Sequence, residues 1–254
     1  MTIDLFRQDA YRTECEAQII AITEQGIVLD QTVFYPLGGG QAGDTGMLQL
    51  AHGVSLTVVD TRKGRDADGQ PNQSIVHVPS PEQADELATL RVGDRVTARI
   101  DWQRRHKLMR FHTTTHLLCH LVPQLVNGCS ITPEYARIDF NMTDPLDKEA
   151  LSAGIAALVA AGHAVTVGEI SDAELDANPS LVKSMSVQPP RGSGHIRTIR
   201  VGGDDGAGLI DFQPCGGTHV ANTAEIGAIV ATKIEKKSAT TRRVVLGFAA
   251  PLEA

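Results

Sequence analysis

Four side chains that can bind a metal ion occur in two short motifs of the sequence. His112 and His116 are four residues apart in a run that is typical of a helix, and Cys215 and His219 have the same spacing in a glycine-rich segment. Residues i and i+4 share one face of a helix at about 6 Å, so both imidazoles can reach one ion. One thiolate with several imidazoles favours zinc over magnesium or calcium. The two motifs therefore predict a zinc site of hydrolytic type.

Neighbouring residues narrow the chemistry of this site without settling its role. The residue after His112 is threonine, which excludes the HExxH metalloprotease mechanism, because that mechanism needs a glutamate there as general base. Cys119 and His120 follow closely enough to compete for the ion, and we expect both to pack in the core instead. Four protein ligands are usual in structural zinc sites, whereas catalytic sites keep one position open. Both roles are compatible with the residues alone.

Composition indicates an ordinary globular protein. The 254 residues include 42% hydrophobic and 21% charged residues, with a formal net charge of −7 that argues against a generally basic nucleic-acid surface. Four cysteines in a chain of this size do not suggest a disulfide framework. The first residues have no features of a secretory signal, and no apolar run approaches the roughly 18 residues that span a bilayer. We expect a cytoplasmic protein without a membrane partner.

Positive charge is concentrated in two places despite the acidic balance. One cluster precedes the histidine pair and the other lies near the end of the chain. Such clusters can bind phosphate groups, although many are only solvated faces. The candidate phosphate contacts are Arg104, Arg105, Lys107, Arg110, Lys233, Lys236 and Lys237.

The first hundred residues have a pattern of short strands. Period-two alternation and β-branched runs predict strands at 17–23, 26–30, 54–60, 74–78 and 94–100. Turn residues between 61 and 73 predict an exposed hairpin loop there. Several short strands at this spacing suggest a small antiparallel barrel.

A glycine-rich segment interrupts these strands. Gly38, Gly39 and Gly40 are followed by Gln41, and ordering three successive glycines is entropically costly. The segment is either a loop that lets the backbone approach a ligand, with Gln41 as a polar contact, or a wide turn with bulges. It lacks the lysine of a P-loop, so we do not expect ATP to bind.

The pattern changes at Asp101, which can cap a helix. Helical residues continue from 102 to about 126, with a possible break at Phe111. A helix at 145–162 follows, with strands before and after it. We place a domain boundary near residue 100, which gives domains 1–100 and 101–254. Helices combined with a mainly sequential sheet predict a two-layer α+β architecture for the second domain.

The two metal motifs resemble those of the editing domain of alanyl-tRNA synthetase and, more distantly, of threonyl-tRNA synthetase. The matching residues are His-Thr-Thr-Thr-His at 112–116 and Cys-Gly-Gly-Thr-His at 215–219. Leu29-Asp-Gln-Thr-Val-Phe-Tyr-Pro, Gly38-Gly-Gly-Gln41, Gly43-Asp-Thr-Gly46 and Glu225-Ile-Gly227 resemble the alanine branch. The resemblance covers about residues 5–248. Without an aminoacylation domain, the chain resembles the stand-alone alanyl-tRNA editing proteins of the AlaX type, in their medium-length form.

This resemblance implies a fold, a reaction and roles for particular residues. It implies an N-terminal β-barrel followed by an editing domain, zinc bound by the two motifs, and deacylation of tRNA(Ala) mischarged with serine or also glycine. It further implies that a polar residue in the loop after the histidine helix, at 127–132, reads the serine hydroxyl. Ser130 and Thr132 are our candidates there, and Gln41 is the candidate from the glycine-rich segment. Thr113 to Thr115 could contribute, although helical threonines often bond only their own turn.

Two other functions fit the same residues. One is a non-catalytic tRNA-binding module whose zinc is structural, because the ligand set is complete with four protein groups. The other is a zinc hydrolase of free amino-acid derivatives, which would use the same ligands without the basic clusters. The sequence leaves the oligomeric state open.

Overall fold

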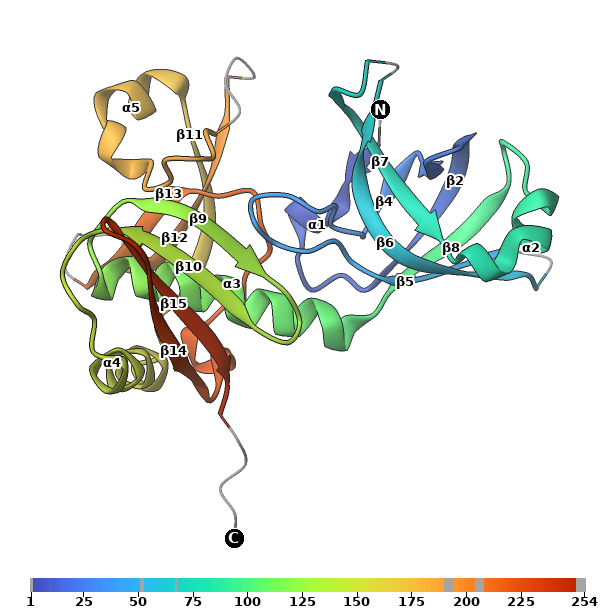
Figure 1. The fold of residues 1–254 in the computed structure, drawn as a ribbon. Coiled ribbons are helices and arrows are strands. Elements are labelled where there is room, and N and C mark those ends of the chain that lie inside the picture. The colour runs from blue at the N-terminus through green and yellow to red at the C-terminus, as the bar shows by residue number, and fades with distance from the viewer. Residues whose placement is uncertain (1, 51–52, 67, 190–193, 204–207, 250–254) are drawn as a thin grey trace, which may run out of the picture. The chain divides into compact units, whose positions relative to one another are not determined.

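The structure is a computed structural model that describes residues 2–50, 53–66, 68–189, 194–203 and 208–249. The chain divides into two compact units, Met1–His106 and Lys107–Ala254. Both units contain helices and strands (Figure 1), which confirms the predicted α+β class. In the described ranges, no helix combines the length and the apolar character that a bilayer crossing requires. The domain boundary near residue 100 stays a prediction.

Six antiparallel strands of the first unit pair in the closed order β2-β3-β7-β6-β5-β8. Strand β8 closes the order because it pairs with both β2 and β5. Alternate side chains of β2 and β6 are buried, and they join an aliphatic core. The strands are β2 (Glu14–Thr23), β3 (Gly26–Leu29), β5 (Gly46–Leu50), β6 (Ser55–Arg65), β7 (Pro71–Pro79) and β8 (Arg95–Ile100).

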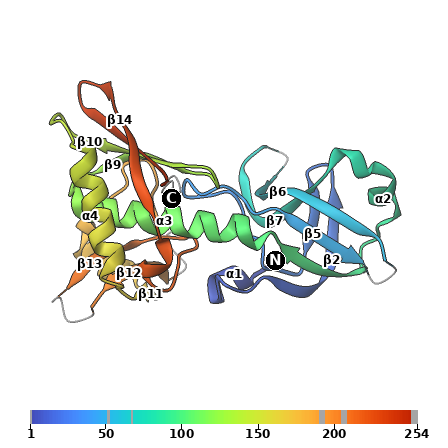
Figure 2. The same cartoon turned by 90° about the horizontal axis from the view of Figure 1, so that it is seen from below.

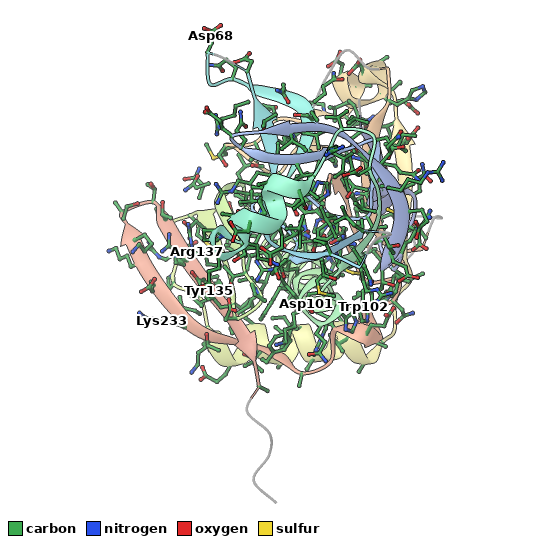
Figure 3. All side chains as sticks on the ribbon, turned by 90° about the vertical axis from the view of Figure 1, so that its right-hand side faces the viewer. Asp68, Asp101, Trp102, Tyr135, Arg137 and Lys233 are labelled. Carbon is green, nitrogen blue, oxygen red and sulfur yellow. The ribbon has the colours of Figure 1, made fainter. Side chains whose placement is uncertain are left out.

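The predicted exposed loop at 61–73 was wrong. Strand β6 extends to Arg65 and β7 begins at Pro71, which leaves a short turn with Asp68 at its tip (Figure 3). Asp66 builds this turn, because its carboxylate accepts the N–H of Asp68 at 3.0 Å and that of Gln70 at 2.8 Å. The turn residues were therefore read correctly, but their extent was overestimated.

Shorter elements complete the first unit. Strand β1 pairs in parallel with β4 and is followed directly by α1. A 3-10 turn and α2 lie between β7 and β8. These elements are β1 (Ile3–Asp4), α1 (Leu5–Gln8), β4 (Gln31–Thr32), η1 (Pro81–Gln83) and α2 (Ala84–Thr89).

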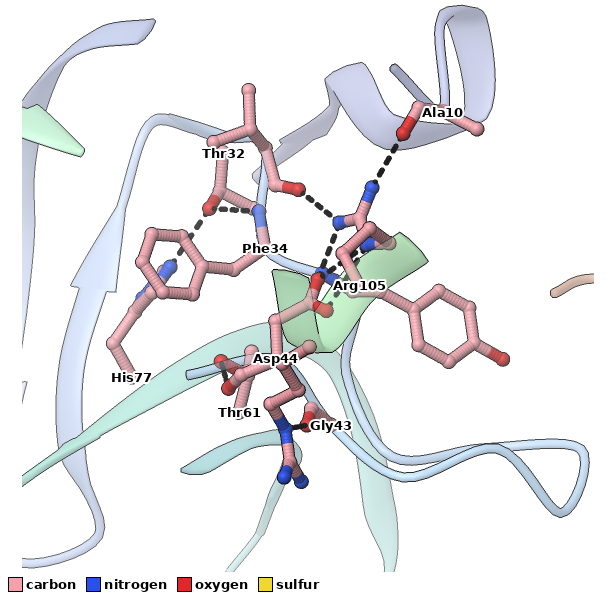
Figure 4. A network of polar contacts seen from close by, with 11 residues as sticks. Ala10, Thr32, Phe34, Gly43, Asp44, Thr61, His77 and Arg105 are labelled. Carbon is pink, nitrogen blue, oxygen red and sulfur yellow. Dashed lines mark hydrogen bonds and ion pairs between the residues drawn. The ribbon is translucent and has the colours of Figure 1, made fainter. Parts of the chain in front are cut away.

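A buried ion pair holds the glycine-rich segment of the first unit (Figure 4). The Arg105 and Asp44 side chains are both fully buried, and Arg105 Nε donates to both carboxylate oxygens at 3.0 Å. Arg105 also donates to the carbonyls of Ala10 and Val33, at 2.9 and 2.6 Å. The prediction that Arg105 contacts phosphate is wrong, because its guanidinium is saturated inside the protein.

Close packing explains one glycine of this segment. A Cβ at Gly43 would lie 2.2 Å from the carbonyl oxygen of Thr61, closer than side-chain carbons approach backbone. By contrast, a Cβ at Gly38 would meet nothing closer than 3.6 Å. Packing against β6 therefore requires glycine at position 43 but not at position 38.

Helix α3 (Trp102–Leu121) carries the histidine motif. Asp101 caps it as predicted, since its carboxylate accepts the Arg104 N–H at 3.1 Å. The helix is continuous, so the expected break at Phe111 was wrong. The Phe111 ring instead packs on Phe248, with centroids 4.5 Å apart.

Two sheets make up most of the second unit. One has the order β14-β15-β10-β9, and the other has the order β11-β12-β13. Helix α4 lies against β14 (Figure 2). The elements are β9 (Val126–Ile131), β10 (Ala136–Asn141), α4 (Lys148–Ala160), β11 (Val165–Ile170), α5 (Asp172–Ala177), η2 (Pro179–Leu181), β12 (Ile196–Gly202), β13 (Leu209–Pro214), η3 (Thr223–Ile226), β14 (Ile229–Ser238) and β15 (Thr241–Phe248). The segment expected as a loop at 127–132 is mostly strand β9, because it pairs with β10.

Candidate metal centre

The two motifs meet in the second unit. The ligand atoms of His112, His116, Cys215 and His219 all lie within 4.8 Å of one another. Cys215 Sγ is 3.5 Å from His112 Nε2 and 3.3 Å from His219 Nε2. Helix α3 supplies two donors from adjacent turns, and the loop after β13 supplies the other two. The structure therefore brings together all four residues that spacing singled out, in a group that could hold one metal ion.

Electrostatics of the cluster suit metal binding. Burial by itself would raise the pKa of Cys215, but the imidazoles of His112 and His219 lower it well below the ordinary value. Burial lowers the pKa of His219 well below its ordinary value, which favours the neutral ring. A thiolate and a neutral imidazole are the forms in which these side chains bind metals.

Asp211 on β13 fixes the orientation of His116. Its Oδ2 is 2.7 Å from His116 Nδ1, and the Asp211 side chain is fully buried. A carboxylate only accepts hydrogen bonds, so Nδ1 carries the proton and Nε2 is left for the cluster. Burial opposes charge on His116, but the bond to Asp211 outweighs it and raises the pKa to about 9. A metal ion must therefore displace a proton from Nε2 when it binds.

Asp211 itself is held by two further donors. Lys183 forms an ion pair with Oδ1, and Gln213 Nε2 donates to Oδ2 at 2.8 Å. Burial would raise the pKa of Asp211, but the bonds from His116 and Lys183 lower it, so the carboxylate is charged. Sequence reasoning missed these three residues. The available signal was one charged side chain, Asp211, between the apolar residues Ile210 and Phe212.

One threonine of the histidine motif plays the matching role for His219. Thr113 Oγ1 lies 3.2 Å from His219 Nδ1 and accepts the Val220 N–H at 3.3 Å. When Nε2 faces the cluster, Nδ1 carries the proton and donates to Thr113. Thr114 and Thr115 instead donate to carbonyls of their own helix. Thr114 and Thr115 therefore bond only their own turn, as helical threonines often do, and a contribution of these threonines to serine recognition stays a prediction.

Arg197 on β12 shapes the second ligand loop. Its Nη1 donates to the carbonyl of Cys215 at 2.6 Å and to that of Gly217 at 3.0 Å. The Cys215 N–H donates in return to the Arg197 carbonyl at 3.1 Å. These bonds hold the backbone between the two ligands in a curve, and the sequence did not indicate them.

The two residues expected to compete for the ion lie outside the ligand group. Cys119 is buried, as predicted, and burial raises the pKa of its thiol to about 12. His120 is exposed at the last turn of α3, and its Nδ1 bonds the Ile210 carbonyl at 3.0 Å. The prediction of core packing was therefore wrong for His120, which lies at the end of α3, after nine consecutive buried residues at 111–119.

Two candidates for reading the serine hydroxyl, Ser130 and Thr132, lie at the end of β9 and in the turn to β10. Cys129 is near Cys119 and Cys215, and burial followed by those two thiols raises its pKa to about 12. Ser130 is the next residue of the strand, so its side chain points to the opposite face. Thr132 Oγ1 donates to the Tyr135 carbonyl at 3.0 Å, within the turn. Their role in substrate recognition stays a prediction.

Gln41 lies in the first unit, whereas all four metal ligands lie in the second. Its side chain is buried, and its backbone pairs in both directions with Gly38 at 3.1 and 3.0 Å. The Tyr35 hydroxyl donates to the Gly38 carbonyl at 2.8 Å, which closes the turn further. A catalytic role for Gln41 stays a prediction.

The remaining candidate phosphate contacts differ in availability. Arg104 Nε donates to the Gly43 carbonyl at 3.2 Å, and Arg110 Nε donates to the Ile226 carbonyl at 2.7 Å. Burial lowers the pKa of Arg110, whose guanidinium also lies over the Phe248 ring. Both arginines therefore already have structural partners.

The lysines are more accessible than the arginines. Lys107, Lys236 and Lys237 are exposed. Lys233 is also exposed (Figure 3) but pairs with Glu235 at 2.6 Å. Exposed ammonium groups remain free to exchange a surface partner for a phosphate at little cost.

The chain is similar to tRNA synthetase domains and to alanyl-tRNA editing proteins. The family described as threonyl and alanyl tRNA synthetase second additional domain matches residues 196–245, and class II (A) tRNA synthetases match residues 6–104. An alanyl-tRNA editing protein AlaX-M of Saccharolobus solfataricus is 32% identical over 248 residues, 96% of this chain and 98% of its own. Its counterpart in Methanosarcina mazei is 32% identical over 253 residues, covering 96% and 95%. An alanine–tRNA ligase of Sulfurisphaera tokodaii is 31% identical over 92% of this chain but only 25% of its own length.

Fold and site together define a protein of the synthetase-editing class, with a three-histidine, one-cysteine cluster between a helix and a strand-end loop. The matches over nearly the full length are more specific than the class. The chain belongs to the AlaX-M family of alanyl-tRNA editing proteins.

Proposed function

We propose that the protein is a zinc-dependent deacylase that removes serine, and also glycine, from mischarged tRNA(Ala). The observation that carries this proposal is the cluster of His112, His116, Cys215 and His219, whose histidines are buried, in a chain of the alanyl-tRNA editing family. Editing proteins are hydrolases, and the bond to be broken is the ester between the amino acid and the terminal ribose. Ester hydrolysis needs no ATP. We infer a cytoplasmic location, where aminoacyl-tRNA is used.

The donor set fits a zinc ion. One partly buried thiolate and three imidazoles are typical zinc ligands, and Asp211 and Thr113 orient two of those imidazoles with Nε2 toward the cluster. When bound, zinc supplies the Lewis acidity that ester hydrolysis requires. The protein's own contribution is to keep His116 and His219 in the correct tautomers, to keep Cys215 ionised, and to limit water around them.

Specificity is the reason for a second site. A pocket that accepts alanine cannot strongly reject serine, because serine adds only a hydroxyl group. A separate editing site can instead select serine by bonding that hydroxyl. Ser130, Thr132 and Gln41 are our candidates for this contact.

Recognition of the tRNA would rest on phosphate contacts. Lys107, Lys233, Lys236 and Lys237 support this proposal because they are exposed. Phosphate contacts position a nucleic acid without reading its sequence. We further propose that the closed strand cycle of the first unit is a small β-barrel domain, and that the second unit is a two-layer editing domain.

The decisive experiment is a panel of alanine tRNAs charged with serine, glycine and alanine, incubated with purified protein. We expect the wild-type protein to release serine and to leave alanine on its tRNA. The His116→Ala variant should release neither. Release of serine by His116→Ala at the wild-type rate would refute the role of the metal. Hydrolysis of free seryl esters at the same efficiency, without competition from uncharged tRNA, would favour an amino-acid-derivative hydrolase.

A structural zinc is the second candidate, and the complete four-ligand set favours it. Chelation separates the two functions. Loss of the folded far-UV spectrum together with the metal supports a structural ion, whereas loss of deacylation with the fold intact supports catalysis.

A further inference from the structure

A cavity lies in the first unit, and none of the metal-centre residues line it. It has a volume of about 350 Å³, within the usual range for ligand sites. Four segments build it: the chain start, the glycine-rich segment at Pro36, strand β6 at Lys63, and the start of β7. The cavity is therefore formed by the tertiary fold of the first unit and not by one local loop.

The floor of this cavity is apolar and fixed. Ile75 lines it and belongs to a small buried cluster with Phe6 and Tyr35. The Phe6 and Tyr35 rings meet edge to face with centroids 5.4 Å apart. Because this cluster anchors both α1 and the glycine-rich segment, the polar residues above it have a stable base.

The wall of the cavity carries positive charge. Lys63 is exposed, and its ammonium group forms no ion pair or hydrogen bond with any described residue. Arg7 also lines the cavity, but it pairs with Asp4 at 2.8 Å. Two cations and one carboxylate leave a surplus of one positive charge. Lys63 is the single lysine in residues 1–106 of a chain whose net charge is −7.

Uncharged polar side chains line the same cavity. Ser74 Oγ donates to Asn72 Oδ1 at 2.6 Å, which uses the acceptor of that amide. The side-chain NH2 groups of Asn72 and Gln73 donate to no group in the described part of the chain. A ligand rich in acceptors and carrying negative charge satisfies these groups, whereas a cation or an apolar ligand does not.

We propose that this cavity binds a phosphate group of the RNA backbone, held by Lys63 with the side-chain amide of Gln73, which lies two residues from Ile75, the partner of Lys63 across the strands. Lysine, asparagine and glutamine commonly make such contacts, which position the nucleic acid. The RNA is the tRNA of the proposed function, so the inference rests on that function for its ligand. It adds a phosphate contact in the first unit that belongs to neither of the two basic clusters that the sequence indicated.

The test is the salt dependence of tRNA binding by the full chain. Fluorescence anisotropy of labelled, uncharged alanine tRNA gives the affinity between about 50 and 200 mM salt. Removing one phosphate contact reduces the slope of log affinity against log salt concentration by about 0.7 to 0.9. The fall in tRNA affinity between these two salt concentrations should therefore be about threefold smaller for Lys63→Met than for wild type. Lys63→Arg should restore the slope. Arg62→Met is the matched control, because Arg62 is the adjacent residue on β6, points to the other face and pairs with Asp60.

A wild-type slope in Lys63→Met overturns the proposal, as does an equal loss in Arg62→Met, which would indicate a diffuse charge effect. NMR of labelled protein tests the source of the phosphate. Shifts of the backbone amides at 72–75 on adding tRNA support the RNA contact. Shifts with inorganic phosphate but none with tRNA overturn it.

Failure of the two proposals can be told apart. If the protein binds tRNA with the predicted Lys63 dependence but releases no serine, the deacylase function fails and the cavity inference stands. If serine is released while Lys63→Met leaves both the salt slope and the KM for tRNA unchanged, only the cavity inference fails.

Discussion

Replacing Asp211 by asparagine tests whether the carboxylate behind His116 supports metal binding. The change keeps the shape of the side chain and an acceptor oxygen for His116 Nδ1, but it removes the negative charge. It also deprives Lys183 of its ion-pair partner, Asp211 being fully buried and Lys183 25% exposed. Loss of such an outer partner typically reduces metal affinity or activity about 10- to 100-fold. This corresponds to about 1.4 to 2.8 kcal/mol, because each tenfold change is worth about 1.4 kcal/mol.

The assay is competition for zinc between the protein and a chromophoric chelator, followed by deacylation at saturating zinc. Glu149→Gln is the control, since Glu149 is 80% exposed and far along the sequence from the cluster. Asp211→Asn combined with Lys183→Met separates the lost charge from the stranded ammonium, and we expect the double variant to bind zinc no worse than the single one. An Asp211→Asn protein that is folded and binds zinc like wild type would refute the orienting role.

Three further predictions concern other buried groups. Arg105→Met should lower the free energy of unfolding by about 3 to 5 kcal/mol in urea titrations, because it leaves the Asp44 charge buried and unpaired, and a change below about 1 kcal/mol would contradict the buried pair. Burial lowers the pKa of His77 to about 4, so its neutral form is favoured in the fold, and stability that is full above pH 6.5 is lost as the pH falls toward 4. The free energy of unfolding, from denaturant titrations followed by Trp102 fluorescence, should fall by about 2 kcal/mol between about pH 7.5 and 5. His77→Gln should abolish this fall. Thr113→Val should weaken zinc binding through His219 without unfolding the protein, whereas unchanged affinity would leave Thr113 a packing residue only.

Local spacing predicted the ligands well, and long-range contacts were beyond it. His112 and His116 fall on one helix face, and Cys215 and His219 on one tight loop, so each pair needed only its own segment. Asp211 lies 95 residues from the histidine that it orients, and its place between apolar residues marks it as unusual without naming that partner. Partners at such separations depend on how β13 is placed against α3, which sequence periodicity does not encode.

The basic cluster before the histidines shows the same limit within one helix. Arg104, Arg105 and Lys107 are almost adjacent in sequence, yet they differ in burial from half-buried through fully buried to exposed. A helix turns by about 100° per residue, so neighbours must point in different directions. Composition alone treated them as one surface. The apolar face of the helix could have separated them, had its direction been known.

The charge of the donor set bears on whether an ion bound there would be structural or catalytic. Three neutral imidazoles and one thiolate leave a divalent ion with a net charge of about +1, whereas two thiolates with two imidazoles give about 0 and four thiolates about −2. Asp211 would reduce this charge further, but Lys183 offsets it from the opposite carboxylate oxygen. A more positive ion is a stronger Lewis acid and polarises an ester carbonyl more effectively. The composition of the donor set therefore favours catalysis, even though the number of ligands is that of a structural site.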